Sequence, residues 1–413
     1  MTEILLIADD LTGALDGAVA FVGAGVEVFP LASRLPSESD FAHGPRVIAV
    51  NAATRHLAPE QAAAVVSKVV RVARESGVRV VLKKTDSALR GNVGAELAAA
   101  REAFGATAHF VPAYPGLGRI TRGGVHYVCG VPVSESSFGK DPFEPVRHSA
   151  VRDVIASQSP VSTQVVGSGE PVPWGFEGIA VYDAATQGEV DAIAARVLAS
   201  GPVLLAGCAG LAAAVAHALG FSDLPTPELP RGNVAALCGS VNPASVAQCT
   251  YAKETGAPTW TVTEAQKKDA SWLGSLAFSE LVGDVAQSWD ACPLTVVDAS
   301  AYTPAADGSS PPAAVRDRVA ANLGALARAI ALAHASPDGC LFVMGGDVLL
   351  ALVEVVGART LRVFGEVTTG VVVSGLLVDG VSVNVISKSG GFGEEDLFRR
   401  VSELLSVPVC TSA

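Results

Sequence analysis

The sequence predicts an α/β protein of two domains, each built on a mostly parallel sheet flanked by helices. Short apolar runs rich in β-branched residues alternate with longer helical stretches, and this alternation is typical of doubly wound parallel sheets. The chain has 413 residues, more than a single hydrophobic core normally holds. Residues 223–232 contain three prolines and no periodic pattern. We therefore expect an N-terminal domain at 1–222, a linker at 223–232 and a C-terminal domain at 233–413.

The first half of the chain supplies most of this alternation. Its apolar runs predict strands at Ile4–Ala8, Val26–Pro30, Val47–Asn51, Val78–Lys83, His109–Pro112, Gly178–Tyr182 and Val203–Ala206. Helical spacing of apolar residues predicts helices at Pro59–Ser76, Val93–Phe104, Gln187–Leu198 and Ala209–Ala218. Ligands of such folds bind beyond the carboxyl ends of the strands, so functional side chains are expected there.

Two adjacent aspartates, Asp9 and Asp10, follow the first strand and precede a helical run. One aspartate is explained as a helix N-cap, because Asp is favoured at that position. Two neighbouring carboxylates repel each other, so the second one indicates a functional role.

A second polar cluster, Lys83 to Asn92, lies between a buried strand and a helix. It contains two lysines, Arg90, the carboxylate of Asp86 and the hydroxyls of Thr85 and Ser87. These groups suit a small polar anion, such as a hydroxy-carboxylate or a phosphate, and do not suit an apolar ligand. The net charge of the chain is −12, which argues against a nucleic-acid partner. A site made locally positive by Lys83, Lys84 and Arg90 can still bind an anion.

Residues 114–145 form a long stretch rich in Gly, Pro, Arg and Ser. Long loops of this kind are usually functional or disordered. The many polar and turn-forming residues of this stretch favour a lid or a hairpin. The insert is also a candidate interface for a homodimer.

The second half of the chain predicts another α/β domain with three glycine turns. Strands are expected at Val234–Cys238, Thr295–Asp298, Gly339–Met344 and Val381–Ile386, and helices at Pro312–Ala335 and Val348–Val356. The turns are Gly239-Ser240, Gly345-Gly346-Asp347 and Ser387–Gly393, the last with the cation of Lys388. Glycine lets backbone N–H groups approach an anion closely, and a helix N-terminus favours negative charge. Three such turns in one domain indicate a nucleotide site.

Several standard sites are absent from the sequence. It has no P-loop motif, no Gly-x-Gly-x-x-Gly opening a helix after the first strand and no Gly-x-Ser-x-Gly nucleophile elbow. The seven cysteines include no Cys-x-x-Cys pair and no zinc-like Cys/His spacing. No signal peptide precedes the first strand. We therefore expect buried thiols and a cytoplasmic protein with no nucleic-acid or membrane partner.

Taken together, these motifs resemble those of the four-carbon acid sugar kinases, which phosphorylate threonate, erythronate or 3-oxo-tetronate with ATP. The matching N-terminal segments are Ala8–Ala14, Asn51–Arg55, Lys83–Asn92, Pro112–Pro115, Gly118–Arg119, Gly124–Val128 and Asp141–Pro142. The matching C-terminal segments are Gly239-Ser240, Gly345–Asp347, Gly365-Glu366 and Lys388–Gly393. The order and spacing of so many segments are more specific than any one of them.

This resemblance implies ATP-dependent phosphorylation of a hydroxyl, the terminal 4-OH, with the active site in the cleft between the two domains. It implies that the sugar acid binds in the N-terminal domain and ATP in the C-terminal domain, with Mg²⁺ bridging the phosphates. The implied substrate contacts are Asp9, Asp10, Arg55, Lys84, Thr85, Asp86 and Ser87. The implied ATP contacts are Ser240, Gly345, Gly346, Asp347, Val348 and Gly390 or Gly391.

The residue chemistry is consistent with these roles. Arg55 can hold the sugar-acid carboxylate bidentately, and Lys84 and Arg90 can stabilise charge on the transferring phosphoryl group. Either Asp86 or Asp9 can act as the base, and the sequence leaves this choice open.

The nucleotide side departs from the family pattern. Val348 stands where the family usually has Thr, Ser240 is followed by Val-Asn rather than Cys-Ser, and Cys208 replaces a Ser. A lost hydroxyl removes about 1 kcal/mol if it made one hydrogen bond. The alternatives are therefore a catalytically weakened sensor of sugar acid and nucleotide, or a kinase for another small hydroxy-acid.

Overall fold

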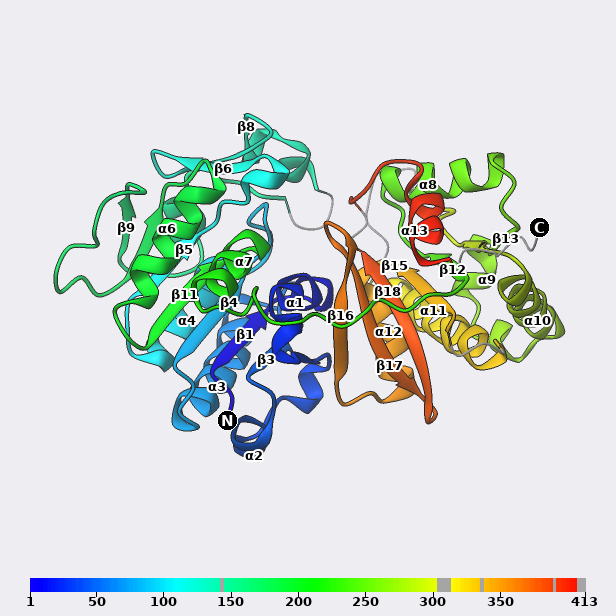
Figure 1. The fold of residues 1–413 in the computed structure, drawn as a ribbon. Coiled ribbons are helices and arrows are strands. Elements are labelled where there is room, and N and C mark those ends of the chain that lie inside the picture. The colour runs from blue at the N-terminus through cyan, green and yellow to red at the C-terminus, as the bar shows by residue number, and fades with distance from the viewer. Residues whose placement is uncertain (142–144, 303–312, 335–337, 389–390, 407–413) are drawn as a thin grey trace, which may run out of the picture. The chain divides into compact units, whose positions relative to one another are not determined.

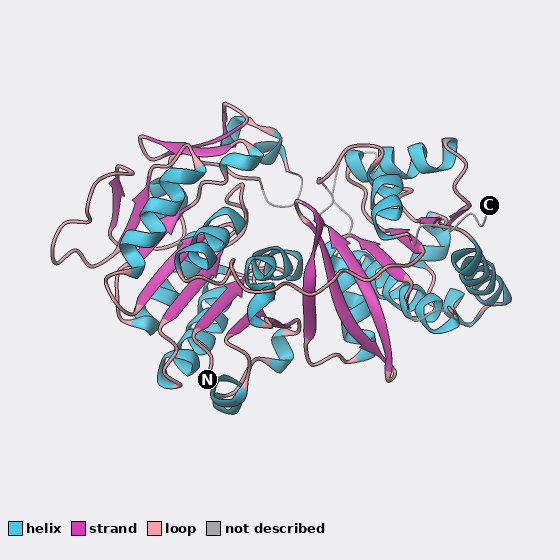
Figure 2. Cartoon of the chain, viewed as in Figure 1, coloured by secondary structure: helices cyan, strands magenta, loops and turns pink. Residues whose placement is uncertain are grey.

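The computed structural model describes residues 1–141, 145–302, 313–334, 338–388 and 391–406. The chain divides into two compact units, Met1–Thr226 and Pro227–Ala413, and the division falls within the proline-rich stretch 223–232. Each unit consists of a sheet flanked by helices (Figures 1 and 2). The predicted α/β class is therefore confirmed.

The main sheet of the first unit is parallel throughout its described pairings. Its strands lie in the order β2-β3-β1-β4-β11-β5-β10-β9. In chain order they are β1 (Ile4–Ala8), β2 (Glu27–Phe29), β3 (Val47–Asn51), β4 (Val80–Lys84), β5 (Ala108–Val111), β9 (Thr163–Val166), β10 (Ile179–Tyr182) and β11 (Val203–Gly207). The sequence analysis anticipated these strands apart from β9, which is short and only half-buried.

Helices cover both faces of this sheet (Figure 1). One face carries α3 (Pro59–Glu75), α4 (Val93–Phe104) and α5 (Val151–Ala156), whose apolar side chains share one core with β1, β3 and β4. The other helices of this unit are α1 (Leu11–Ala18), α2 (Glu38–His43), α6 (Gln187–Leu198) and α7 (Ala209–Ala218). Helix α3 shows why these helices pack on the sheet: its apolar residues recur at helical spacing and form one buried stripe. The stripe consists of Ala62, Val66, Val69, Val70 and Ala73.

The insert at 114–145 is a hairpin structure in its described part. Strands β6 (Arg119–Arg122), β7 (Val125–Val128) and β8 (Val131–Pro132) form a small antiparallel sheet. Gly123 and Gly124 close its first turn with φ values of 57° and 74°, which glycine adopts at low cost. The backbone N–H groups of both glycines donate to the carboxylate of Asp183, so the hairpin is tied to the unit.

The sheet of the second unit has the strand order β13-β14-β12-β15-β18-β17-β16. Its strands are β12 (Val234–Cys238), β13 (Thr259–Thr261), β14 (Leu294–Asp298), β15 (Cys340–Met344), β16 (Leu361–Thr368), β17 (Val371–Val378) and β18 (Val381–Lys388). Its helices are α8 (Pro243–Glu254), α9 (Glu264–Lys268), α10 (Leu276–Ala291), α11 (Ala313–Ala333), α12 (Gly346–Val356) and α13 (Leu397–Leu405). The sequence analysis anticipated β12, β14, β15 and β18, and it missed β13 and the antiparallel strands β16 and β17.

Six of the cysteines lie in the described part of the chain, and these six are free thiols, four of them buried. Cys410 lies outside the described residues. Within the described residues, no helix has both the length and the apolar character needed to cross a membrane.

Candidate active site

The first candidate site lies where neighbouring strands of the first unit end. Ala8 of β1 pairs with Asn51 of β3 and with Lys84 of β4, and Lys84 pairs with Gly207 of β11. The chain order reverses at β1, because β3 lies on one side of it and β4 on the other. Ligands of open α/β sheets bind beyond the strand ends at such a reversal.

Arg55 offsets the repulsion between the adjacent carboxylates of Asp9 and Asp10. Its Nε donates to Oδ2 of Asp9 at 2.7 Å, and its Nη1 donates to Oδ2 of Asp10 at 2.5 Å. Asp10 also caps helix α1, since its Oδ1 accepts from the backbone N–H of Gly13 at 2.7 Å. Capping therefore explains Asp10, and Asp9 is the carboxylate that needs another role.

Asp86 organises the turn between β4 and α4. Its Oδ2 accepts from the backbone N–H groups of Ala88 and Arg90, at 3.0 and 3.3 Å. The Arg90 guanidinium donates to Oδ2 at 3.1 Å and to Oδ1 at 2.8 Å. Burial alone would raise the pKa of Asp86, but the charges of Arg90 and Arg55 outweigh burial and hold the pKa far below its ordinary value. Both oxygens of Asp86 are thus committed to the turn.

The two lysines of β4 point to opposite faces of the sheet, as strand geometry requires. The buried Nζ of Lys83 lies 2.7 Å from Oε2 of Glu96 on α4. Nζ of Lys84 lies 3.5 Å from Oδ2 of Asp16 on α1 and donates to the carbonyl of Thr85 at 3.1 Å. The expectation of a positive cluster built from both lysines is therefore wrong, because each ammonium faces a carboxylate and Lys83 belongs to the core.

Two buried oxygens of this site have no hydrogen-bond partner within the described part of the chain, Oδ1 of Asp9 and Oγ1 of Thr85. Burial would raise the pKa of Asp9, but the charges of Arg55 and Lys83 outweigh it, and the pKa lies below its ordinary value. Asp9 is thus an anion with one uncommitted oxygen. An unpaired buried acceptor is costly, and a ligand hydroxyl would satisfy it.

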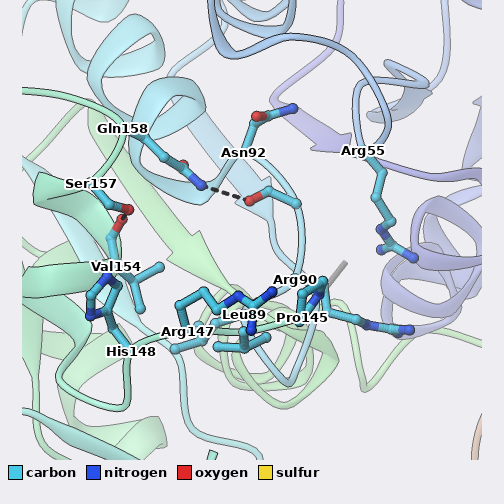
Figure 3. Close-up of a pocket in the computed structure, with 12 residues that line it drawn as sticks. Arg55, Leu89, Arg90, Asn92, Pro145, Arg147, His148, Val154, Ser157 and Gln158 are labelled. Atoms are coloured by element: carbon cyan, nitrogen blue, oxygen red, sulfur yellow. Dashed lines mark hydrogen bonds between the residues drawn. The ribbon is translucent and has the colours of Figure 1, made fainter. Parts of the chain in front are cut away.

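A pocket of about 320 Å³ lies beside this cluster (Figure 3). Its lining includes Arg55, Arg90 and Gly91 together with residues 145–148. Gln158 fixes part of the wall, since its Nε2 donates to the carbonyl of Gly91 at 2.9 Å. The volume falls within the range of small-molecule sites. The sequence analysis did not single out residues 145–148 or Gln158, because they carry no motif.

His126 of the hairpin insert supports the same turn from outside. Its Nδ1 lies 3.1 Å from Oγ1 of Thr121, and its Nε2 lies 3.0 Å from the backbone carbonyl of Ser87. A carbonyl only accepts, so Nε2 carries the proton and Nδ1 accepts from Thr121. Burial lowers the pKa of His126 to about 4, and the ring is neutral near pH 7. The sequence analysis gave this residue no role.

The residues predicted to bind a nucleotide lie at the corresponding edge of the second unit's sheet. Cys238 at the end of β12 pairs with Met344 of β15, and Met344 pairs with Lys388 of β18. A Cβ atom placed on Gly345 would lie 3.7 Å from the backbone nitrogen of Ser240. One placed on Gly391 would lie 3.7 Å from Nδ2 of Asn242, the N-cap of α8. The described parts of the three glycine turns are therefore neighbours, and Gly390 lies outside the described residues.

Gly345 shapes the start of α12. Its φ of 111° is accessible to glycine and strained for other residues, and the helix begins at Gly346 without a side-chain cap among the described residues. Asp347 is exposed in the first turn, whereas Val348 is buried. The uncapped N–H groups of this turn suit an anion such as a phosphate.

Lys388 directs its ammonium into the unit rather than toward solvent. Its Nζ donates to Oγ of Ser245 at 3.2 Å and to the carbonyl of Phe392 at 3.1 Å. Nε2 of Gln248 on α8 lies 3.0 Å from the carbonyls of Phe392, Gly393 and Glu394. Burial lowers the pKa of Lys388 to about 8. These two side chains hold the end of the third turn against α8.

Two family models together match most of the chain. Residues 4–215 match the model described as "Sugar-binding N-terminal domain", and residues 235–398 match "Nucleotide-binding C-terminal domain". A crystal structure from Salmonella typhimurium LT2 has a TM-score of 0.76 at 22% identity, with 98% of this chain and 100% of that chain covered. At that identity the match shows the fold alone.

Curated relatives extend this similarity over nearly the full chain. The D-threonate kinase of Bordetella bronchiseptica is 31% identical, with 97% of this chain and 96% of the relative covered. The D-erythronate kinase of Heliobacterium modesticaldum is 29% identical, with 96% and 95% covered. The 3-oxo-tetronate kinase of Methylobacterium radiotolerans is 26% identical, with 97% and 98% covered.

Proposed function

Because the chain belongs to the four-carbon acid sugar kinase family, we propose that it transfers the terminal phosphoryl group of ATP to its substrate. The acceptor is the terminal 4-OH of a four-carbon acid sugar such as threonate, erythronate or 3-oxo-tetronate. The observation that carries this proposal is the uncommitted oxygen of Asp9 within a buried cluster of carboxylates and cations. A hydroxyl nucleophile needs such an acceptor in phosphoryl transfer.

Asp9 is the group that orients the attacking hydroxyl and accepts its proton. Asp86 is the weaker candidate, because both of its oxygens already accept hydrogen bonds from the turn and from Arg90. Asp86 instead fixes Arg90, and the charge of Asp86 holds the pKa of Arg90 above its ordinary value. Asp9 and Asp86 thus divide the roles that the sequence left open.

The cations of the site stabilise the charge of the transferring phosphoryl group. Burial would lower the pKa of Lys84, but the negative charges around it, with Asp16 first and Asp10 and Asp9 adding to it, together outweigh burial, and the ammonium stays protonated. Arg55 contacts the substrate through the part of its guanidinium that Asp9 and Asp10 leave uncommitted. Thr85 and Ser87 supply hydroxyls to the polar groups of the sugar acid.

ATP binds in the second unit, at Ser240, Gly345, Gly346, Asp347, Val348 and Gly391, with Gly390 beyond the described residues. The left-handed Gly345 and the uncapped start of α12 support this assignment. In the described part of the chain, no three His, Cys, Asp or Glu side chains gather as a metal site. We propose that Mg²⁺ would arrive bound to the nucleotide, whose phosphate oxygens would supply its ligands together with water.

An ADP-release assay tests this function. ATP–Mg²⁺ is supplied with a panel of threonate, erythronate and 3-oxo-tetronate stereoisomers. Turnover on one of them is expected and identifies the substrate. If the folded protein released no ADP with any acid of the panel, the proposed substrate class would be overturned. Calorimetric titration with ATP–Mg²⁺ would then separate a kinase for another hydroxy-acid from a protein that binds no nucleotide.

We propose in addition a cytoplasmic protein, consistent with its free and mostly buried thiols, and a homodimer. Cell fractionation tests the first proposal. Light scattering after size exclusion tests the second, with twice the chain mass expected.

A further inference from the structure

The cations around the candidate site are mostly neutralised from within the protein. Arg55 faces Asp9 and Asp10, and Arg90 faces Asp86 directly, with Asp141 at 3.6 Å from its Nη1. These guanidinium groups hold the protein's own carboxylates in place. A substrate carboxylate needs a cation with spare donors, since charge-assisted bidentate pairs are the strong ones.

Arg147 is such a cation. It lines the same pocket as Arg55 and Arg90, and it comes from a different segment of the chain (Figure 3). Its side chain is exposed, and within the described residues no carboxylate lies within ion-pair distance of it. His148 lines the pocket beside it.

Gly91 lies between the pocket that Arg147 lines and Asp9, which does not itself line that pocket. Gly91 lines the pocket, and a Cβ atom placed on Gly91 would lie 3.4 Å from Oδ2 of Asp9. Gly91 is held by Gln158, and Asn92 is held by its own hydrogen bonds to the carbonyls of Thr54 and Leu57, both at 2.9 Å. Gly91 and Asn92 are therefore fixed by hydrogen bonds from side-chain amides to backbone carbonyls.

We propose that Arg147 binds the carboxylate of the sugar acid and so selects acids over neutral polyols. This inference rests on the proposed function. The substrate lies across Gly91, with its carboxylate at Arg147 and its phosphorylated hydroxyl at Asp9. Arg147 is a specificity-determining residue, and Arg55 serves mainly to hold Asp9 and Asp10.

The test compares the best sugar acid with its carboxamide, which has the same shape and no negative charge. In Arg147→Gln we expect the KM for the acid to rise 10- to 100-fold, as for the loss of a hydrogen-bonded charge pair, with kcat changed less than threefold. The KM for the carboxamide should stay within twofold. Arg147→Lys keeps the charge and should recover part of the loss.

Arg152→Gln is the matched control, because Arg152 is exposed on α5 and pairs with its neighbour Asp153 at 3.4 Å. It should leave both KM values unchanged. The role of Arg147 would be overturned if Arg147→Gln raised the KM for the acid and for the carboxamide equally, or left the KM for the acid unchanged. In either case, turnover of the acid by the wild-type chain would still support the proposed function. No turnover by the wild-type chain on any acid would overturn both.

Discussion

The two units place their candidate sites at the same structural position and build them from different parts of the polypeptide. In each unit the site follows the carboxyl ends of strands at a reversal of chain order, at β1 in the first unit and at β12 in the second. The first site consists of buried charged side chains that hold one another, as Arg55 holds Asp9. The second consists mainly of glycine backbone, with Gly345 at φ 111°.

This difference matches two kinds of ligand. A sugar acid is distinguished by the placement of its hydroxyls and carboxylate, and such discrimination needs fixed side-chain donors and acceptors. A phosphate chain is recognised through its oxygens, and backbone N–H groups at a helix start suffice for that. The first site should therefore be sensitive to side-chain chemistry, and the second to backbone geometry.

The largest effect is expected from Asp9→Asn, which keeps the shape of the side chain and removes the proton acceptor. We expect kcat to fall by about 10²- to 10⁴-fold, the range for loss of a general base. Steady-state kinetics at saturating ATP–Mg²⁺ provide the measurement.

Asp40→Asn is the matched control for Asp9→Asn, because Asp40 caps the surface helix α2 at Ser37 and lies outside the site. It should keep wild-type turnover. If Asp9→Asn turns over at the wild-type rate, Asp9 is not the base. The expectation that the first site is sensitive to side-chain chemistry would then be wrong.

A smaller effect is expected from the titration of His126. Its pKa is about 4 in the folded chain and about 6.5 in an unfolded chain, so the unfolded state binds the proton first as the pH falls. The free energy of unfolding should therefore decrease as the pH falls from 6.5 to 4. The contribution of this residue is about 3 kcal/mol, because each unit of pKa difference between the two states corresponds to about 1.36 kcal/mol. Urea unfolding at a series of pH values measures this decrease.

His126→Gln should remove this share of the pH dependence and raise the KM for the sugar acid, because Ser87 loses its support. His109→Gln is the matched control, since burial also lowers the pKa of His109 to about 4 and its ring contacts Tyr182 rather than the turn. It should flatten the pH dependence without changing the KM. A KM change of equal size in both variants would contradict the support role.

The smallest effect is expected from Gly345→Ala in the second site. An added methyl group opposes the φ of 111°, at a cost of about 1–3 kcal/mol, and the turn should relax away from its present shape. We expect a higher KM for ATP and a lower melting temperature.

Gly357→Ala introduces a left-handed alanine at the other end of α12, where φ is 62° and ψ is 34°, at a cost of about 1–2 kcal/mol. It should lower the melting temperature and leave the KM for ATP unchanged. If both variants leave the KM unchanged, backbone geometry at Gly345 does not govern nucleotide binding.

The sequence predicted the buried parallel strands, because each is a continuous apolar run, and it missed the parallel strands β9 and β13, which are short and only partly buried. It did not predict β16 and β17, whose described pairing contains register shifts near Gly365. Bulges interrupt the period-two pattern on which strand prediction depends. The expected capping role of one of the two aspartates is confirmed, because Asp10 is the N-cap of α1, which begins at Leu11.

The sequence located the polar clusters of the site and did not resolve how they pair. Lys83 and Lys84 were both counted as site cations, although neighbours in a strand point to opposite faces. Glu96 was not recognised as the partner of Lys83, because it lies within an ordinary helical pattern. His126 and Arg147 depend on contacts between distant segments, which no local motif records.

The hydrogen bonds that build the first site also bear on how fast it forms. The contacts Arg55 to Asp9, Asn92 to Thr54 and His126 to Ser87 join residues 46, 38 and 39 positions apart. Loops of this length must close before such contacts gain any stability, so they slow folding more than local helices do. We therefore expect the site to assemble late in the folding of the first unit, with activity returning after helicity when the denatured chain refolds.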